Sequence, residues 1–143
     1  MVDLPTEAMW EYACRAGTVT ALNNGKNLSD VNKCSEIAEV GRYSFNHDDG
    51  KGGSDWITKV GMYQPNAWGL YDMHGNSPEW CLEGLGNLGT AAVVDPKGPK
   101  GGNSRVIRSG SGSSNAAGCR SASRGSAYTW NSSGIRLCCF ASN

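Results

Sequence analysis

Clusters of turn-forming residues divide this chain into short segments and restrict its fold more than any other feature. NNGKN begins at Asn23, and further clusters read HDDGKGGSD, QPNAWG, MHGNSPEW and DPKGPKGG. Gly, Pro, Asn and Asp favour turns, so each cluster interrupts regular structure. The segments EVGRYSF, WITKVGMY, RVIRS and GIRLCCF are predicted to be short strands. A bundle of long helices is therefore excluded.

One segment near the N-terminus, PTEAMWEYACRAG, has the pattern of a helix. Thr6 is the expected N-cap, Glu7 and Arg15 complement the helix dipole, and Gly17 is the expected stop. The apolar side chains expected to face a sheet are Met9, Tyr12 and Ala13, with Trp10 and Cys14 alongside. One helix followed by short strands and long ordered loops predicts a single α+β domain, residues 1–143, with an antiparallel sheet.

The stretch from Arg108 to Gly134 is built almost wholly from Ser, Gly, Ala and Asn, although it lies between two predicted strands. Such residues bury little apolar surface. Composition alone favours a flexible loop here.

The charge balance excludes some partners. Thirteen basic and thirteen acidic residues give a formal net charge of zero, so no long-range field attracts nucleic acid or an anionic membrane. The chain has no apolar run long enough to cross a bilayer, and its N-terminus lacks the pattern of a signal peptide. We expect no nucleic-acid partner and no membrane insertion, and the compartment stays open.

Six cysteines are scattered along the chain without a CxxC motif. Their even number leaves disulfides open, but the absence of a secretion pattern favours buried free thiols. Cys138 and Cys139 follow each other in a strand and point to opposite faces, so they cannot serve one site. His47 and His74 lie in no metal-binding pattern, and DDGKGG at residues 48–53 is most simply a turn.

Five segments in order, LPTEAMWEYACRAG, PNAWGLYDMHGNSPEWCLE, RVIRSGS, CRSASR and GIRLCC, strongly resemble the formylglycine-generating-enzyme, or sulfatase-modifying-factor, family. The resemblance implies a C-type lectin fold. Members usually have about as much chain again before the LPTEA element, which implies either a minimal domain or another source for the missing edge. The chain departs from the family pattern at Met9, Ser77, Pro78, Ser109 and Gly112.

The family's oxidases use two reactive cysteines in the region that corresponds to GSSNAAGCRSASR. Here Ser114 lies near the place of the first cysteine, and only Cys119 is present. Redox chemistry needs a thiolate with a second thiol or a metal. We therefore expect Cys119 to be structural and the protein not to be an enzyme.

The resemblance also raises the prospect of calcium, because family members bind this ion in the loop that corresponds to HGNSPEW. Asn76 and Glu79 retain side-chain oxygens that suit a hard cation. Two side chains do not complete a site of six or more ligands. A purely hydrogen-bonded loop is the alternative.

One branch of the family serves as the variable protein of diversity-generating retroelements, in which error-prone copying of adenines changes chosen codons near the C-terminus. Changing the adenines of an Asn codon can give Ser, Gly, Ala or Tyr but not Trp, so Trp130 is interpreted as framework. Residues 105–137 are the candidate variable region. The candidate ligand-binding positions within it are Ser113, Ser114, Asn115, Ala117, Gly118, Ser123, Gly125, Ser126, Ala127, Tyr128, Asn131, Ser132 and Ser133.

We therefore predict a C-type-lectin-fold protein that binds a protein or other macromolecular ligand. A phage particle, a cell surface or neither stays open as its location. Residues 113–118, 123 and 125–133 are expected to be exposed on one contiguous face. Their expected anchors in the flanking strands are Val106, Ile107, Ile135 and Leu137. The alternatives are a divergent formylglycine-generating oxidase and a calcium-dependent lectin of fixed specificity.

Overall fold

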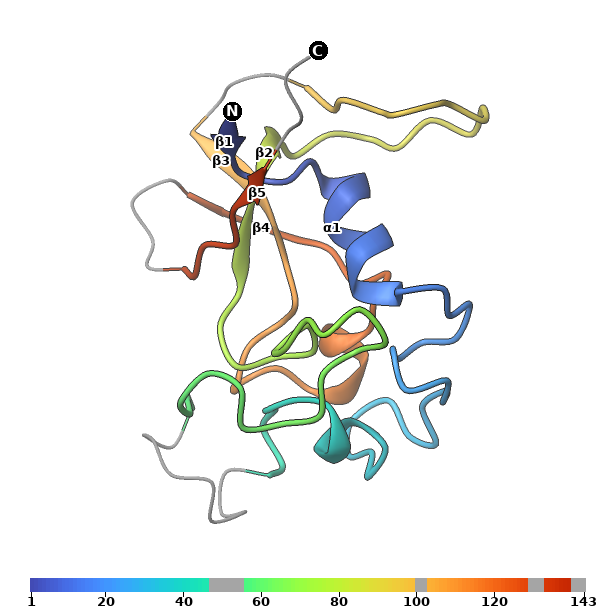
Figure 1. The fold of residues 1–143 in the computed structure, drawn as a ribbon, viewed down its shortest axis with the longest axis vertical. Helices are drawn as coiled ribbons and strands as arrows, with labels where there is room; N and C mark the ends of the chain where they lie inside the picture. The colour runs from blue at the N-terminus through green and yellow to red at the C-terminus, as the bar shows by residue number, and fades with distance from the viewer. Residues whose placement is uncertain (47–55, 100–102, 129–132, 140–143) are drawn as a thin grey trace.

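A three-stranded antiparallel sheet forms the centre of the structure (Figure 1). The computed structural model describes four stretches of the chain: residues 1–46, 56–99, 103–128 and 133–139. β3 (Ser104–Arg108) lies between β2 (Glu79–Gly84) and β4 (Gly125–Tyr128). The β2–β3 register shifts between Trp80 and Gly84, whereas the β3–β4 register is regular.

The remaining elements are short. β1 (Val2–Asp3) pairs antiparallel with β5 (Cys138–Cys139) and brings the two ends of the described chain together. α1 (Glu7–Arg15) packs against β2 and β3. Two 3-10 helices, η1 (Ile37–Glu39) and η2 (Ala116–Cys119), lie among the long loops that fill the lower half of Figure 1. The described residues thus contain one α-helix, short antiparallel strands and long ordered loops, as the sequence predicts.

The ends of α1 follow the predicted signals. Thr6 caps the helix, and its Oγ1 accepts a hydrogen bond from the Met9 amide at 3.2 Å. At the other end, Ala16 takes the left-handed conformation with φ 44°, and Gly17 follows with φ 94°. The chain therefore leaves the helix at Ala16, one residue before the predicted stop.

The predicted buried face of α1 is partly wrong. Trp10 and Cys14 are buried, whereas Met9 and Tyr12 are exposed. Residues four apart lie on one face of a helix, so Trp10 and Cys14 together face the sheet. Tyr12 points away from it and meets the Trp68 ring edge-on, with 5.0 Å between ring centroids.

Two apolar clusters form the core. One lies between α1 and the sheet and consists of Trp10, Cys14, Met73, Cys81 and Val106. The other holds the loops of the lower half and consists of Leu22, Cys34, Ile37, Tyr43, Ala116 and Cys119. All six cysteines are free.

Two loops of the lower half cross with their main chains in direct contact. A Cβ on Gly41 would lie 1.5 Å from the His74 carbonyl oxygen, and one on Gly75 would lie 1.8 Å from that of Arg42. Side chains at these positions would force the two loops apart. The segment from His74 onward is therefore fixed by its neighbour.

The strand predictions succeed only in part. RVIRS corresponds to β3, but EVGRYSF and the described WITKVGMY segment form no strand. Of the described residues of GIRLCCF, Gly134–Cys139, only Cys138 and Cys139 are in a strand. β2 was missed because its first residues belong to the cluster MHGNSPEW, which was interpreted as a turn. No helix in the described part of the chain is both long and apolar enough to cross a bilayer.

Candidate ligand-binding surface

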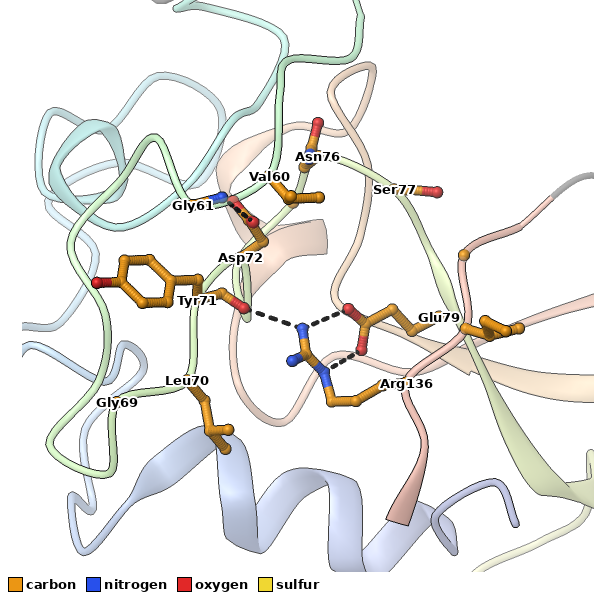
Figure 2. Close-up of a pocket in the computed structure, with 13 residues that line it drawn as sticks. Val60, Gly61, Gly69, Leu70, Tyr71, Asp72, Asn76, Ser77, Glu79 and Arg136 are labelled. Atoms are coloured by element: carbon orange, nitrogen blue, oxygen red, sulfur yellow. Dashed lines mark hydrogen bonds and ion pairs between the residues drawn. The ribbon is translucent and has the colours of Figure 1, made fainter. Parts of the chain in front are cut away.

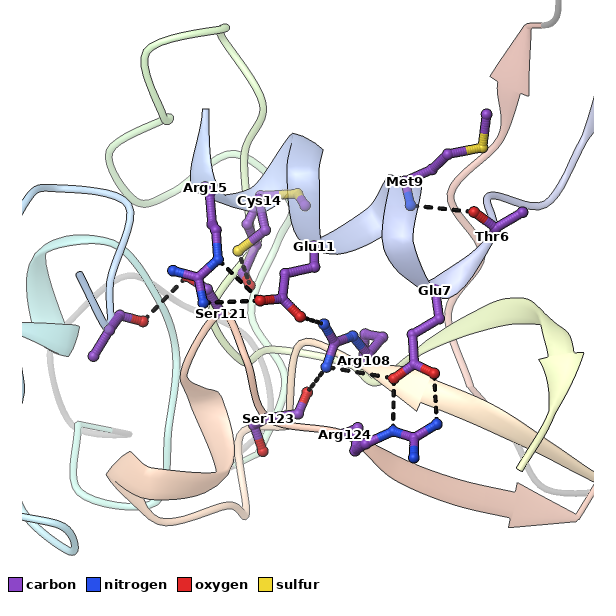
Figure 3. Close-up of polar contacts among 12 residues, drawn as sticks. Thr6, Glu7, Met9, Glu11, Cys14, Arg15, Arg108, Ser121, Ser123 and Arg124 are labelled. Carbon is purple, nitrogen blue, oxygen red and sulfur yellow. Dashed lines mark hydrogen bonds and ion pairs between the residues drawn. The ribbon is translucent and has the colours of Figure 1, made fainter. Parts of the chain in front are cut away.

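Arg108, the last residue of β3, anchors one end of the small-residue stretch to α1 (Figure 3). Its side chain is 1% exposed and its guanidinium lies 5.4 Å from the centre of the Trp10 ring. One terminal nitrogen pairs with Glu11, and the other donates to the Ser123 carbonyl at 2.6 Å and lies 3.7 Å from Glu7. These contacts join the end of β3 both to α1 and to the approach to β4.

Arg124, directly before β4, makes a second connection to the helix. Its Nε and Nη2 donate to the two carboxylate oxygens of Glu7 at 2.8 and 2.6 Å, and Nη1 donates to the Gly86 carbonyl. The hydrogen bond with Glu7 raises the pKa of Arg124. A bidentate pair fixes direction as well as distance. The start of β4 is therefore held in place.

The candidate positions differ in burial from some of the other residues in the same stretch, 109–128. The buried residues described between 109 and 128 all lie outside the candidate positions: Ser109, Gly112, Ala116, Cys119 and Ser121. The exposed candidates are Ser113, Asn115, Ser126 and Tyr128. The half-buried candidates are Ser114, Ala117, Gly118, Ser123, Gly125, Ala127 and Ser133. Asn131 and Ser132 lie outside the described residues.

Three of the packing expectations are wrong. Ala116, within the run expected to be exposed, is buried in the core of the lower half. Ile135 and Leu137, expected to be anchors, are 68% and 59% exposed. The reason is that β5 begins only at Cys138, so the preceding residues do not pack as a sheet strand. Val106 is a core residue, as expected.

Apart from Ser123 and Ser133, the described candidate positions form two groups in different parts of the fold, whereas one contiguous face was expected. The loop group, residues 113–118 without Ala116, adjoins the loop at 31–32, because the amides of Ala116 and Ala117 donate to the carbonyls of Asn32 and Val31. The strand group is β4 itself. In Figure 1, η2 lies among the lower loops, and β4 lies in the sheet above them.

Two members of the loop group also shape its turn. Ser114 Oγ accepts from the Ser111 amide at 3.0 Å, and the Ser114 carbonyl accepts from the Ser44 amide. Asn115 caps η2 by accepting from the Gly118 amide at 3.0 Å. Sequence reasoning missed these roles, although Asn is a common cap.

Burial raises the pKa of two cysteine thiols, Cys14 and Cys119. Cys119 is buried, with Sγ 3.9 Å from the Ser111 carbonyl oxygen, and burial raises its pKa to about 12. Ser111 also donates its amide to Ser114 Oγ, so Ser114 and Cys119 contact the same residue, and Cys34 lies in the same core cluster as Cys119. Burial also raises the pKa of Cys14 to about 12. A thiol of this kind stays protonated at neutral pH.

His74 is fully buried between the core clusters. Its Nε2 accepts from the Asn23 amide at 3.0 Å, and its Nδ1 lies 2.7 Å from the Cys119 carbonyl oxygen, to which it donates. Burial lowers the pKa of His74 to about 4, and the charge of Arg15 adds to this shift. The residue is a neutral hydrogen-bonded histidine. His47 and the segment DDGKGG lie outside the described residues.

A pocket of about 430 Å³ lies beside the segment that follows β4 (Figure 2). Arg136 lies within it and donates to both oxygens of Glu79, at 2.8 and 2.6 Å, and to the Tyr71 carbonyl. The buried Trp10 indole also donates to Glu79, at 2.7 Å. Burial is the largest single effect and opposes the charge of Arg136, but the hydrogen bond with Glu79 and the attraction of nearby negative charges together raise its pKa.

The two predicted calcium ligands line this pocket with their side chains already engaged. Asn76 Oδ1 accepts from the Thr58 amide at 2.9 Å, and the Glu79 carboxylate binds Arg136. Among the buried side-chain oxygens of the described pocket residues, Oδ1 of Asp72 lacks a hydrogen-bond partner, and sequence reasoning missed this residue although it lies in the same motif. Calcium needs six to eight oxygen ligands. No described group of three or more His, Cys, Asp or Glu residues is arranged to hold a metal, so these side chains do not fit calcium as they stand.

Comparisons with known proteins agree with this fold. Residues 2–139 match the family model described as Sulfatase-modifying factor enzyme 1-like domain. The formylglycine-generating enzyme of Thermomonospora curvata is 34% identical over 121 residues, which cover 76% of this chain and 37% of that protein. Serine/threonine-protein kinase pkn1 of Chlamydia pneumoniae is 38% identical over 111 residues, covering 75% of this chain and 15% of that one.

Two solved structures superpose on nearly the whole chain. Treponema denticola variable protein 1 has a TM-score of 0.77 at 31% identity and matches 95% of this chain and 46% of its own. PvdO from Pseudomonas aeruginosa has a TM-score of 0.76 at 26% identity, with 95% and 51% covered. These structures confirm the predicted C-type lectin fold. The chain spans about half of each of them and less of the curated relatives.

Proposed function

Because this chain belongs to the family of sulfatase-modifying factor enzyme 1-like domains and folds like a protein named as variable, we propose that it is the variable protein of a diversity-generating retroelement. Its diversified positions would contact a protein or other macromolecular ligand. Its task would be recognition, without covalent chemistry.

The observation that carries the proposal is the division of the small-residue stretch by burial. Its described buried residues all lie outside the candidate positions, and Arg108 and Arg124 are ion-paired to α1, whereas the described candidate positions are exposed or half-buried. A surface of Ser, Gly, Asn and Tyr suits binding, because Tyr offers rigid contact area and the small residues offer adaptable hydrogen bonds. The same small side chains inside a core would bury little.

The geometry also ranks the candidate positions. Ser113, Ser126 and Tyr128 are exposed, and among them Ser113 lies in the turn and hydrogen-bonds the Ser111 hydroxyl. Ser114 and Asn115 support the turn of the loop group, so their replacement has a structural cost. Diversity should therefore be tolerated best at the first three positions.

Catalysis of the formylglycine type is the main alternative, since relatives of this chain are named for it. The buried, protonated Cys119 and the hydroxyl of Ser114 favour binding instead. A CxPxR peptide incubated with the protein, oxygen and copper should keep its cysteine by mass spectrometry. Conversion to formylglycine would overturn the binding proposal.

Two matched libraries test the proposal directly. The first library randomises the exposed Ser113, Ser126 and Tyr128. The second randomises Ser109 and Ser121, two serines of the same stretch that are buried. Most members of the first should resist protease and yield binders to unrelated proteins, because exposed substitutions usually change stability by about 0.5 kcal/mol or less. Most members of the second should unfold.

Equal loss of folding in the two libraries would show that the display positions are structural. A genomic observation is independent of folding. A reverse transcriptase gene nearby, with an adenine-rich near-copy of the codons for residues 105–137, is expected. Its absence from the native locus would contradict the retroelement assignment.

A further inference from the structure

The loop group lies against a short turn, residues 30–33, that is outside the candidate variable region. We propose that Asp30 is a positioning residue, which holds the loop group ready for ligand by fixing this turn. The inference rests on the proposed function and adds a residue of fixed sequence to its binding surface. Asp30 acts through the main chain of the residues that follow it.

One carboxylate oxygen of Asp30 organises the turn. Its Oδ1 accepts hydrogen bonds from the amides of Asn32 and Lys33, at 2.7 and 2.8 Å. These bonds lower the pKa of Asp30, so the acceptor is charged at neutral pH and the bonds are the stronger for it. Residues 30–33 are all exposed, so side-chain packing does little to hold them. The carboxylate therefore sets the course of the main chain at this point.

The turn presents two carbonyls to η2. The Asn32 carbonyl accepts from the Ala116 amide at 3.0 Å, and the Val31 carbonyl accepts from the Ala117 amide at 2.8 Å. The first amides of a helix have no partner within it, so they depend on groups of this kind. Asn32 adds a side-chain contact, because its Oδ1 accepts from Asn115 Nδ2 at 3.3 Å. The turn and the loop group are thus joined by three hydrogen bonds.

Both sides of this junction are anchored in the same core. Ala116 is buried in the cluster of the lower half together with Cys34, the residue directly after the turn. The buried Tyr43 hydroxyl accepts from the Cys34 amide at 3.0 Å and donates to the Cys34 carbonyl at 2.9 Å. The end of the turn is therefore held by the core, and Asp30 holds the part that is exposed.

The attachment of the loop group does not depend on which side chains it displays. Any residue except Pro at position 117 keeps the amide that binds the Val31 carbonyl. Ala116, the other donor, is buried and lies outside the candidate positions. Diversification therefore leaves these main-chain hydrogen bonds intact. A loop that is ordered before binding loses less conformational entropy when a ligand arrives, which favours affinity.

The strand group provides an internal comparison. β4 is held by its pairing with β3 and by the ion pair of Arg124 with Glu7, and neither involves the turn. Loss of the turn should therefore weaken ligands bound by the loop group and spare ligands bound by the strand group.

Amide exchange tests the positioning role without any ligand. In Asp30→Ala the turn loses its acceptor, and the Ala116 and Ala117 amides should exchange about tenfold faster. Asp30→Asn is the matched control, because its side-chain oxygen can accept the same two hydrogen bonds without the charge. It should retain most of the protection. Urea unfolding should show similar global stability for both variants, since residues 30–33 are exposed.

Two libraries of this chain, each selected against purified lysozyme, provide the binding readout. The loop library randomises Ser113, Ala117 and Gly118. The strand library randomises residues 126–128. Asp30→Ala, introduced into the selected binders, should weaken those from the loop library about tenfold and leave those from the strand library unchanged. Asp30→Asn should retain the affinity of the loop binders.

Three outcomes would overturn the inference. They are unchanged exchange at Ala116 and Ala117 in Asp30→Ala, equal loss of affinity in the two sets of binders, and equal loss in Asp30→Asn and Asp30→Ala, which would show that the charge contacts the ligand directly. None of them contradicts the proposed function, which requires only that the display positions bind. Libraries that fold but yield no binders would contradict the proposed function, and amide exchange would still decide the role of Asp30.

Discussion

Replacing Arg108 by Met tests the connection between the small-residue stretch and α1. Met retains apolar contact with Trp10 but removes the charge, the pairing with Glu11 and the hydrogen bond to the Ser123 carbonyl. Removing one partner of a buried ion pair costs about 3 to 5 kcal/mol. We expect the lower end, about 3 kcal/mol, because Glu11 keeps Arg15 and the unpartnered Arg108 Nε disappears.

Urea unfolding followed by tryptophan fluorescence measures this loss, which corresponds to a fall in melting temperature of about 10 °C for a chain of this size. Lys26→Met is the matched control, because its pair with Glu39 joins side chains that are 46% and 48% exposed. That variant should lose far less free energy of unfolding than Arg108→Met, and its loss should shrink in high salt. If the two variants lost the same free energy, the Arg108 cluster would not be a connection of this strength.

Other changes have equally definite outcomes. The pKa of His74 is about 4 when folded and about 6.5 when unfolded, so the neutral His74 stabilises the fold above pH 6.5. About 3 kcal/mol of this stability should be lost as the pH falls from 6.5 to 4. In His74→Gln this contribution to the pH dependence of stability should vanish, and an unchanged pH dependence would contradict the role given to His74. In urea unfolding, Val106→Ala should lower the free energy of unfolding by about 2 kcal/mol, because Val106 is buried. Leu137→Ala, at an exposed side chain, should lower it by less than about 0.5 kcal/mol. The reverse order would refute the packing described. Millimolar calcium should leave the melting temperature unchanged, and a rise that Asp72→Asn abolishes would show that the pocket rearranges to bind the ion.

Local signals in the sequence predict the helix and one strand well. Thr6 and the left-handed exit after Arg15 are short-range features, and they bound α1 within a residue of expectation. β3 was also predicted, because Val106 and its neighbours have strand-forming side chains. Such features depend on a few adjacent residues.

The sequence predictions that failed concern features that depend on contacts between distant segments. EVGRYSF has strand-forming residues, but Gly41 lies directly against the main chain at His74, and the segment is a loop. Glu79 looked like a calcium ligand because nothing near it in sequence shows that Arg136 would occupy its carboxylate. The burial of Ala116 among exposed neighbours likewise depends on the distant residues packed against it.

The connection of α1 to Arg108 and Arg124 affects how the chain is made. The paired residues lie 97 and 117 positions apart, so the helix is synthesised long before the arginines that neutralise its acidic face. Contacts of such separation form late, and a nascent chain cannot complete this core until the ribosome has passed the candidate variable region. A stop codon or frameshift between residues 105 and 124 would leave α1 without one or both of these partners and would destabilise the product. Cells would then remove defective copies by proteolysis, and only variants translated through the whole region would accumulate.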